Sequence, residues 1–297
     1  MVSQATDVRA GGLLSLAVHI LLSVFIAAGL ISTAAATEKP RWRTLPATPQ
    51  LPTTNDHGFV SVDGAKIWYA MFGSGEPVIM LHGGLANSNY WGHQVPDLAK
   101  NYRVVVMDSR GHGRSTRDER PFSYDLMSSD VVALMDHLDI SQAAIIGWSD
   151  GAIIGLKLAI HNPDRIRGVF AFAANSDPSG IEDISDSIVF DQYLQRVSKE
   201  YKDLSSTPDE YDDFLGKMSA MWASQPEITP KDLRSIGTPV WIVDGDHEEV
   251  IRRKNTLLMA DSIPNAGLLI QPEVSHFSLL QGPQQFTADI LRFLQAH

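Results

Sequence analysis

Short apolar runs, separated by polar and turn residues, recur along most of this chain. Each run is rich in Val, Ile, Leu, Met or Ala and shows no alternation with polar residues. Continuous apolar runs bounded by turns are typical of parallel strands buried on both faces. Six runs predict strands at residues 78–81, 104–107, 143–146, 169–173, 240–243 and 268–270.

Helical patterns lie between these runs. Apolar residues recur at a spacing of three and four over residues 126–138, as on one face of a helix. A second pattern follows Gly151 and stops at Asn162-Pro163, and Pro283 is well placed to begin a last helix. Alternating strands and helices predict an α/β fold with a mainly parallel sheet that is covered by helices.

Two segments differ from this alternation. Residues 59–62 and 65–72 flank Asp63-Gly64, a strong signal for a two-residue hairpin. From about residue 175 to 231 there is no strand pattern, and helices are predicted at 188–201 and 211–222. A helical insertion between strands of a parallel sheet usually lies over the strand ends, where ligands bind. We therefore predict a small helical lid at about 175–231.

The first 57 residues are not expected to belong to the folded domain. Residues 11–36 carry no charged side chain, follow Arg9 and end in three alanines, as in a secretory signal peptide. Export to the periplasm or medium is the resulting expectation. The alternative is an uncleaved membrane anchor, because the apolar stretch approaches the roughly 20 residues that span a bilayer. Residues 37–57 hold four prolines and predict a linker, which leaves residues 58–297 as the domain.

Composition narrows the classes of partner. The 297-residue chain has a formal net charge of −11 and no run of Lys or Arg, which argues against nucleic acid. It has no cysteine, which excludes disulfides, a thiol nucleophile and a thiolate metal site. A chain of this length buries a core without help from a metal. We expect a small-molecule substrate, no cofactor and no metal.

The most specific motif is Gly-Trp-Ser-Asp-Gly at residues 147–151. It follows a predicted strand and opens a predicted helix, which is the context of a nucleophile elbow. A sharp turn there lifts Ser149 out of the sheet, the glycines leave room for the turn, and the helix N-terminus favours negative charge. The motif makes Ser149 the candidate nucleophile.

A serine needs a base to be nucleophilic at neutral pH. In folds with such an elbow, the chain order is nucleophile, acid, histidine. Of the ten histidines, His276 is the one that follows both the elbow and an acid on a separate strand end. His276 is therefore the candidate base.

The acid is predicted in the loop after residues 240–243. This loop reads Asp-Gly-Asp-His-Glu-Glu, and the usual spacing places the acid three residues after Gly245, at Glu248. Asp246 is the alternative. The acid would hold the histidine tautomer and stabilise its cation. A metal is the less favoured interpretation of the cluster, because no second ligand group pairs with it.

Backbone N–H groups must stabilise the developing oxyanion. We expect them from Asp150, directly after the nucleophile, and from Gly84, in the loop after residues 78–81. Candidate substrate contacts are Leu85, Trp148 and Trp222. The Asp150 side chain is expected near the acyl pocket, where it would favour cationic over anionic groups; the alternative is that it turns away and pairs with an arginine.

Residues 59–297 resemble the α/β-hydrolase superfamily. The resemblance is carried by the His-Gly-Gly loop at 82–84, the segment 108–115, the Ser149 elbow and the setting of His276. It implies an eight-stranded sheet with the triad at its carboxyl edge, and a mainly architectural role for 108–115. Glu248 is a departure, because Asp is commoner there. The elbow is also similar to that of small-ester hydrolases, including the valacyclovir hydrolase group.

The resulting expectation is a serine hydrolase that cleaves a small ester or lactone through an acyl-enzyme. Hydrolysis of an amide or a carbon–carbon bond is an alternative on the same triad, and acyl transfer to an acceptor other than water is another. A ligand-binding or receptor-like protein with little turnover must also be kept, since fold alone does not determine function.

Overall fold

The computed structural model describes residues 39–297. The signal peptide or anchor predicted at residues 1–36 lies outside this part of the chain. Residues 40–297 form one structural unit. Within the described residues, no helix is both long enough and apolar enough to span a bilayer.

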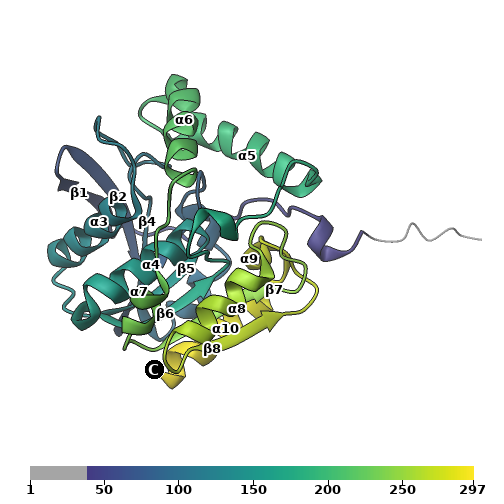
Figure 1. Cartoon of the computed structure of the whole chain (residues 1–297). Helices are drawn as coiled ribbons and strands as arrows, with labels where there is room; N and C mark the ends of the chain where they lie inside the picture. Colours follow the sequence, from purple (N-terminus) through teal and green to yellow (C-terminus); the bar gives the residue numbers. More distant parts are fainter. Residues whose placement is uncertain (1–38) are drawn as a thin grey trace, which may run out of the picture. The chain divides into compact units, whose positions relative to one another are not determined.

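An eight-stranded sheet runs through the middle of the unit, in the order β1-β2-β4-β3-β5-β6-β7-β8 (Figure 1). Only β2 runs against its neighbours, so the sheet is mostly parallel and confirms the predicted fold class. The strands are β1 (His57–Val62), β2 (Ala65–Phe72), β3 (Glu76–Leu81), β4 (Tyr102–Met107), β5 (Ala143–Trp148), β6 (Ile166–Phe172), β7 (Val240–Gly245) and β8 (Gly267–Gln271).

Helices cover both faces of the sheet. Besides the lid, the helices of the described chain are α2 (Val95–Leu98), α3 (Tyr124–His137), α4 (Asp150–His161), α7 (Pro230–Ser235), α8 (Arg253–Ser262), α9 (Ser278–Gln281) and α10 (Pro283–Ala296). Helices α3, α4, α7 and α8 contact one another in that order, and α10 contacts α2. These contacts define two helical layers.

Neighbouring residues on β6 show that the two layers lie on opposite faces. A Cβ atom added to Gly155 of α4 would lie 2.9 Å from Val169, and one added to Gly168 would lie 2.9 Å from Phe293 of α10. Successive residues of a strand point to opposite faces. The central strands are therefore covered on both sides, which is why β5 is buried at every position and has no polar alternation.

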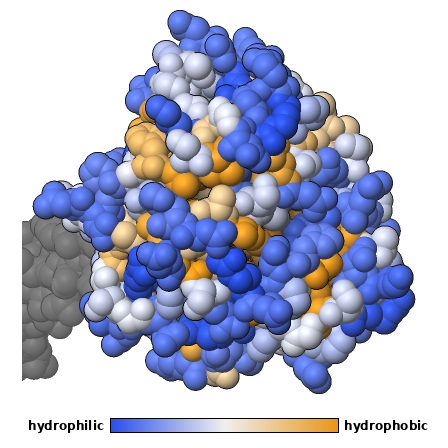
Figure 2. All heavy atoms as spheres, turned by 90° about the vertical axis from the view of Figure 1, so that its left-hand side faces the viewer, coloured by the Kyte–Doolittle hydropathy of each residue, from blue (hydrophilic) through white to orange (hydrophobic). Residues whose placement is uncertain are grey.

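The lid lies between β6 and β7. Helices α5 (Ile188–Leu204) and α6 (Tyr211–Trp222) project beyond the sheet, and α7 leads back to it (Figure 1). Helix α5 starts at Ser187, whose side chain accepts from the backbone of Phe190, and buries residues spaced by four, namely Val189, Tyr193, Val197 and Tyr201. On the face shown in Figure 2, apolar residues gather beneath this projecting part, whose own surface is mainly hydrophilic.

The described part of the Pro-rich segment packs against the lid. The guanidinium of Arg196 on α5 donates to the carbonyls of Leu45 and Pro46, at 2.8 and 2.6 Å. Thr48 donates to Glu200 at 2.5 Å. This segment thus packs against the folded unit, whereas its prolines predicted an extended linker. The difference arises because backbone carbonyls, which carry no sequence signal, make most of these contacts.

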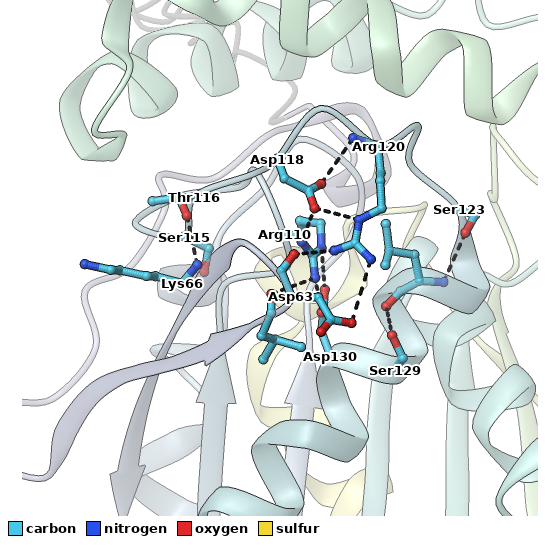
Figure 3. Close-up of polar contacts among 12 residues, drawn as sticks. Asp63, Lys66, Arg110, Ser115, Thr116, Asp118, Arg120, Ser123, Ser129 and Asp130 are labelled. Atoms are coloured by element: carbon cyan, nitrogen blue, oxygen red, sulfur yellow. Dashed lines mark hydrogen bonds and ion pairs between the residues drawn. The ribbon is translucent and has the colours of Figure 1, made fainter.

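A buried ion pair anchors the loop that contains residues 108–115. Arg110 donates to Asp130 on α3, with 2.9 Å between Nε and Oδ2, and both side chains are almost fully buried. A further guanidinium nitrogen lies 3.4 Å from the carbonyl of Val62. Asp118 lies 3.6 Å from Arg110 and also accepts from Arg120 (Figure 3). The cluster ties the first hairpin, this loop and α3 together.

Replacing Asp130 by Ala is expected to lower the free energy of unfolding by about 3–5 kcal/mol, because the buried Arg110 cation would lose its main partner. Urea unfolding followed by circular dichroism measures this. The control is Asp125→Ala on the same helix, where a 65% exposed carboxylate pairs with Lys157 and about 1 kcal/mol or less is expected. Equal effects of the two substitutions would contradict the structural role of Asp130.

Candidate active site

Ser149 stands at the sharp turn between β5 and α4. Its backbone has φ 54° and ψ −119°, a conformation that non-glycine residues adopt rarely. A Cβ atom on Gly147 would lie 2.4 Å from the carbonyl oxygen of Gly151, and one on Gly151 would lie 2.1 Å from that of Leu81. Gly147 is needed because the first turn of α4 lies directly against β5, and Gly151 is needed because α4 also lies against the end of β3. The motif therefore forms the elbow geometry that the sequence predicted.

His276 follows β8 and is buried at 3% exposure. Its Nδ1 atom lies 2.9 Å from Oε1 of Glu248. The loop is held on both sides, since Ser275 donates its N–H to the side chain of Gln281 and His247 donates its N–H to the carbonyl of Val274. A carboxylate oxygen only accepts, so Nδ1 carries the proton and Nε2 is left with a free lone pair.

Glu248, rather than Asp246, contacts the histidine. The Glu248 side chain is 1% exposed, and its Oε1 also accepts from the backbone N–H groups of Val250 and Ile251, at 2.7 and 3.1 Å. The Asp246 side chain is 37% exposed and accepts from the N–H of Val274 at the start of the histidine loop. Asp246 therefore shapes the loop in which His276 lies without reaching the ring.

The base of the lid supports the segment that holds Glu248. Ile181 and Ile251 form an antiparallel bridge. The N–H of Glu182 donates to the carbonyl of Val250, and that of Arg252 donates to the carbonyl of Gly180, both at 2.8 Å. The two amides that donate to the Glu248 carboxylate thus belong to a short pairing with the beginning of the lid. The loop that holds Glu248, called the acid loop, is therefore supported by the lid.

Burial and charge oppose each other at His276. Burial alone would lower the pKa of His276, but the carboxylates of Glu248, Glu249 and Asp150 outweigh it and raise the pKa above the usual value. For Glu248, burial would raise the pKa, but the charge and hydrogen bond of His276 lower it. The pair therefore favours an ionised acid beside a histidine that accepts a proton readily.

Two backbone amides are available beside Ser149. Among the described residues, neither the Gly84 N–H nor the Asp150 N–H donates to another protein atom, as expected for Asp150 in the first turn of α4. The carbonyl of Gly84 accepts from the hydroxyl of Tyr193 at 2.5 Å, which fixes the orientation of this peptide from the lid. His82 accepts the N–H of Ser109 and anchors the start of the loop.

A cavity of about 220 Å³ contains Ser149 and His276. The predicted substrate contacts Leu85, Trp148 and Trp222 line it, as do Gly84 and Asp150. The sequence reasoning missed the other lining residues, which are Tyr124, Asn175, Ile181, Ile184, Phe190, Tyr193, Leu194, Val250 and Ile251. Most of these are apolar and come from the lid and from the acid loop, so the cavity is an apolar pocket with a few polar groups.

The carboxylate of Asp150 faces this cavity and pairs with no arginine in the described chain. Tyr124 donates its hydroxyl to Oδ1 at 2.7 Å, and Trp222 donates its Nε1–H to Oδ2 at 3.0 Å. Burial raises the pKa of Asp150, and these two donors partly offset that effect. No signal marked Tyr124, because it precedes the apolar pattern of its helix. The bond from Trp222 joins α6 of the lid directly to α4.

The described residues hold no group of three or more His, Cys, Asp or Glu placed to bind a metal ion. Two acidic residues of the loop at 244–249 have partners of their own. Glu248 contacts His276, and Glu249 accepts from Ser275 at 3.3 Å.

Three curated relatives align with most of the chain. A non-heme haloperoxidase of Rhodococcus erythropolis is 27% identical, with 79% of this chain and 97% of that protein aligned. For 3-oxoadipate enol-lactonase 2 of Acinetobacter baylyi the identity is 28%, with 73% and 89% aligned. The serine hydrolase BPHL of Mus musculus is 27% identical, with 80% and 85% aligned.

The fold and family matches agree with these relatives. A solved structure described as Est816, an N-acyl homoserine lactone degrading enzyme, has 27% identity and a TM-score of 0.64, and the match covers 79% of this chain and 99% of that one. The sequence model of the alpha/beta hydrolase fold family matches residues 76–197. The chain has the α/β-hydrolase fold, as its motifs predicted, and residues 76–197 match the model of that family.

Proposed function

We propose that this protein hydrolyses a small carboxylic ester or lactone through an acyl-enzyme formed on Ser149. The observation that carries the proposal is the buried contact of 2.9 Å between Glu248 and His276, whose ring lines the same cavity as Ser149. A serine at an elbow, a histidine with a free Nε2 and a buried acid on its Nδ1 are the parts that such a reaction needs.

In the first step, Ser149 Oγ attacks the carbonyl carbon while His276 Nε2 takes the serine proton. The negative charge then develops on the carbonyl oxygen, for which the amides of Gly84 and Asp150 are the available donors. His276 returns the proton to the leaving alcohol as the carbon–oxygen bond breaks. A water molecule, deprotonated by His276, then attacks the acyl-enzyme. As the bond to Ser149 Oγ breaks and the acid is released, His276 returns the proton to Oγ and Ser149 is restored.

Two relatives favour an ester or lactone over other acyl compounds. One is named an enol-lactonase, and the solved structure is described as degrading an acyl homoserine lactone. The apolar pocket suits an uncharged acyl chain, because apolar burial supplies most of the binding free energy of such ligands. In a lactone the leaving alcohol stays attached to the acyl group, so the cavity needs no separate exit for an alcohol product.

Labelling with a fluorophosphonate, followed by a panel of p-nitrophenyl esters and lactones of rising chain length, tests the proposal. The wild type should be labelled at Ser149 and should turn over at least one ester or lactone, whereas Ser149→Ala should not be labelled. A ligand-binding protein would show no turnover across the panel. Preferred cleavage of an amide or a carbon–carbon substrate would replace the proposed substrate class.

The pH dependence of kcat/KM follows from the raised pKa of His276, which must be neutral to act as the base. The acid limb is expected above about pH 6.5, the ordinary histidine value, with activity lost as the pH falls through it. Glu249→Gln should move this limb to lower pH, because it removes a carboxylate beside the ring. Glu273→Gln, which changes a 68% exposed carboxylate, is the control and should leave the limb in place. An acid limb well below pH 6.5 in the wild type would refute the expectation.

Asp150 is expected to select substrates by charge. Unit charges about 4 Å apart interact by roughly 1 to 4 kcal/mol between bulk-water and near-surface dielectrics, so a carboxylate on this wall should disfavour an anionic acyl group at least about fivefold. Neutral or amine-bearing esters should have higher kcat/KM than hemisuccinate-type esters of equal size. Asp150→Asn should narrow this gap. Equal kcat/KM for the anionic and neutral esters at low salt would mean that Asp150 does not contribute to substrate specificity.

A further inference from the structure

One oxygen of Glu248 lacks a hydrogen-bond donor. Its Oε1 accepts from His276, Val250 and Ile251, whereas its Oε2 is buried and accepts from no described residue. A buried carboxylate oxygen without a donor is costly, because it has lost its water without replacement. The orphaned atom belongs to the residue that orients His276, so whatever lies beside it bears on the proposed chemistry.

The group beside Glu248 is the carboxyl of Asp244, at the end of β7. Asp244 is fully buried and lies in hydrogen-bonding contact with the Glu248 side chain. Its Oδ1 accepts from the N–H of Gly245 at 3.0 Å, and its Oδ2 accepts from the hydroxyl of Thr256 at 2.6 Å. Two carboxyl groups in such contact cannot hydrogen-bond to each other unless one of them carries a proton.

The charges around the pair decide which carboxyl holds that proton. Glu248 has His276 and two backbone donors on one oxygen, all of which favour its ionised form. The cation beside Asp244 is Arg253, whose nearest guanidinium nitrogen is 3.7 Å from Oδ2 and whose other nitrogen bonds to the carbonyl of Gly245. Burial, followed by the charge of Glu248, raises the pKa of Asp244 well above its usual range.

We propose that Asp244 is a positioning residue that stays protonated and donates its O–H to Oε2 of Glu248, the carboxylate that orients His276. The bond satisfies the orphaned oxygen and fixes the second half of the carboxylate without adding negative charge near the histidine. An amide or alcohol could make the same bond, but an ionised Asp244 could not. The proposal extends the proposed function, because it concerns the acid of the same triad.

Titration of the His276 ring by NMR tests the protonation state without any substrate, so its outcome does not depend on the proposed reaction. Asp244→Asn keeps the shape and a donor but cannot ionise. If Asp244 is already neutral, this variant should leave the pKa of His276 unchanged. If Asp244 is ionised, the substitution removes a negative charge close to the pair and lowers the pKa of His276 by about one unit, which would overturn the proposal.

Two further variants calibrate this measurement. Glu248→Gln removes the carboxylate that contacts the ring and should lower the pKa of His276 clearly, which proves that the loss of an ionised neighbour is detectable. Asp246→Asn is the matched isosteric change in the same loop, at a carboxyl that is partly exposed and does not contact the ring, and should have little effect. An infrared band of a protonated carboxyl, lost in Asp244→Asn alone, is also expected.

Kinetics test the positioning role. Asp244→Ala should lower kcat about 10- to 100-fold, the worth of a hydrogen bond to a charged group, with KM nearly unchanged. Asp244→Asn should restore most of that loss, because its amide donates to Oε2. An Ala variant with wild-type kcat, or an Asn variant as slow as Ala, would overturn the role. Should the Ala variant fail to fold, the wild type and Asp244→Asn still decide between the two protonation states.

Discussion

Replacing Ser149 by Ala is expected to lower kcat for ester hydrolysis by about four to six orders of magnitude. The substitution removes the only atom that forms the acyl-enzyme, and the members of such a triad act as a unit. What remains is binding and the oxyanion amides, which retain some rate over water. Folding should change little, because the Ser149 side chain makes no capping bond to α4 and its backbone N–H donates to the carbonyl of Phe172 in the sheet whatever the side chain.

The measurement is steady-state kinetics on the best ester of the panel, with thermal unfolding to show that the variant is folded. Ser129→Ala, at an exposed site on α3, is the control and should keep wild-type kcat. A folded Ser149→Ala variant that retains more than about one per cent of wild-type kcat would mean that another group is the nucleophile.

The strands were predictable because their signal is local. All six apolar runs and both arms of the predicted hairpin correspond to strands of the sheet. The observed strands are longer by a few residues where polar positions continue the ladder, as at Glu76 and Tyr102, which pair in register although neither belongs to an apolar run. A strand that is buried on both faces appears in the sequence as a continuous apolar run, whereas a polar strand end does not appear as a run.

The site was predictable where chain order and turn chemistry determine it. Ser149 and His276 could be located because an elbow and a fixed order of elements restrict the candidates. The walls of the pocket could not be located, because helix periodicity shows which face of α5 is buried but not that Tyr193 reaches the carbonyl of Gly84. Likewise, nothing in the sequence pairs Trp42 with His247, whose rings stack at 3.9 Å across about 200 residues.

The acid loop illustrates the same limit at short range. Spacing favoured Glu248 over Asp246, and the structure brings Glu248 to the ring. The same spacing does not distinguish Asp244, which lies at the end of β7, from the carboxylates of the loop that follows. Its importance emerges only from burial and from the missing donor at Oε2 of Glu248. The sequence shows where carboxyl groups occur along the chain, but their protonation depends on burial and on the groups that surround them in the fold.

Replacing Glu248 by Gln is expected to lower kcat by about two to four orders of magnitude with little loss of stability. The backbone N–H groups of Val250 and Ile251 both point at the Oε1 position and require an acceptor there, so the amide oxygen should take that place. His276 would then keep its tautomer and its orientation. The loss would come from the missing charge, because a neutral amide cannot stabilise the imidazolium that forms when Ser149 gives up its proton.

Two measurements distinguish the loss of the Glu248 charge from a displacement of the His276 ring. The acid limb of kcat/KM should move to lower pH in Glu248→Gln, since burial then dominates the pKa of His276, whereas a displaced ring would lower kcat without that shift. Asp246→Asn, the control in the same loop, should change kcat by less than about threefold, because its carboxylate is partly exposed, accepts from the N–H of Val274 and lies 3.9 Å from the ring of His247. If Glu248→Gln kept wild-type activity while Asp246→Asn lost it, the acid of the triad would be Asp246 and the loop would have to rearrange when substrate binds.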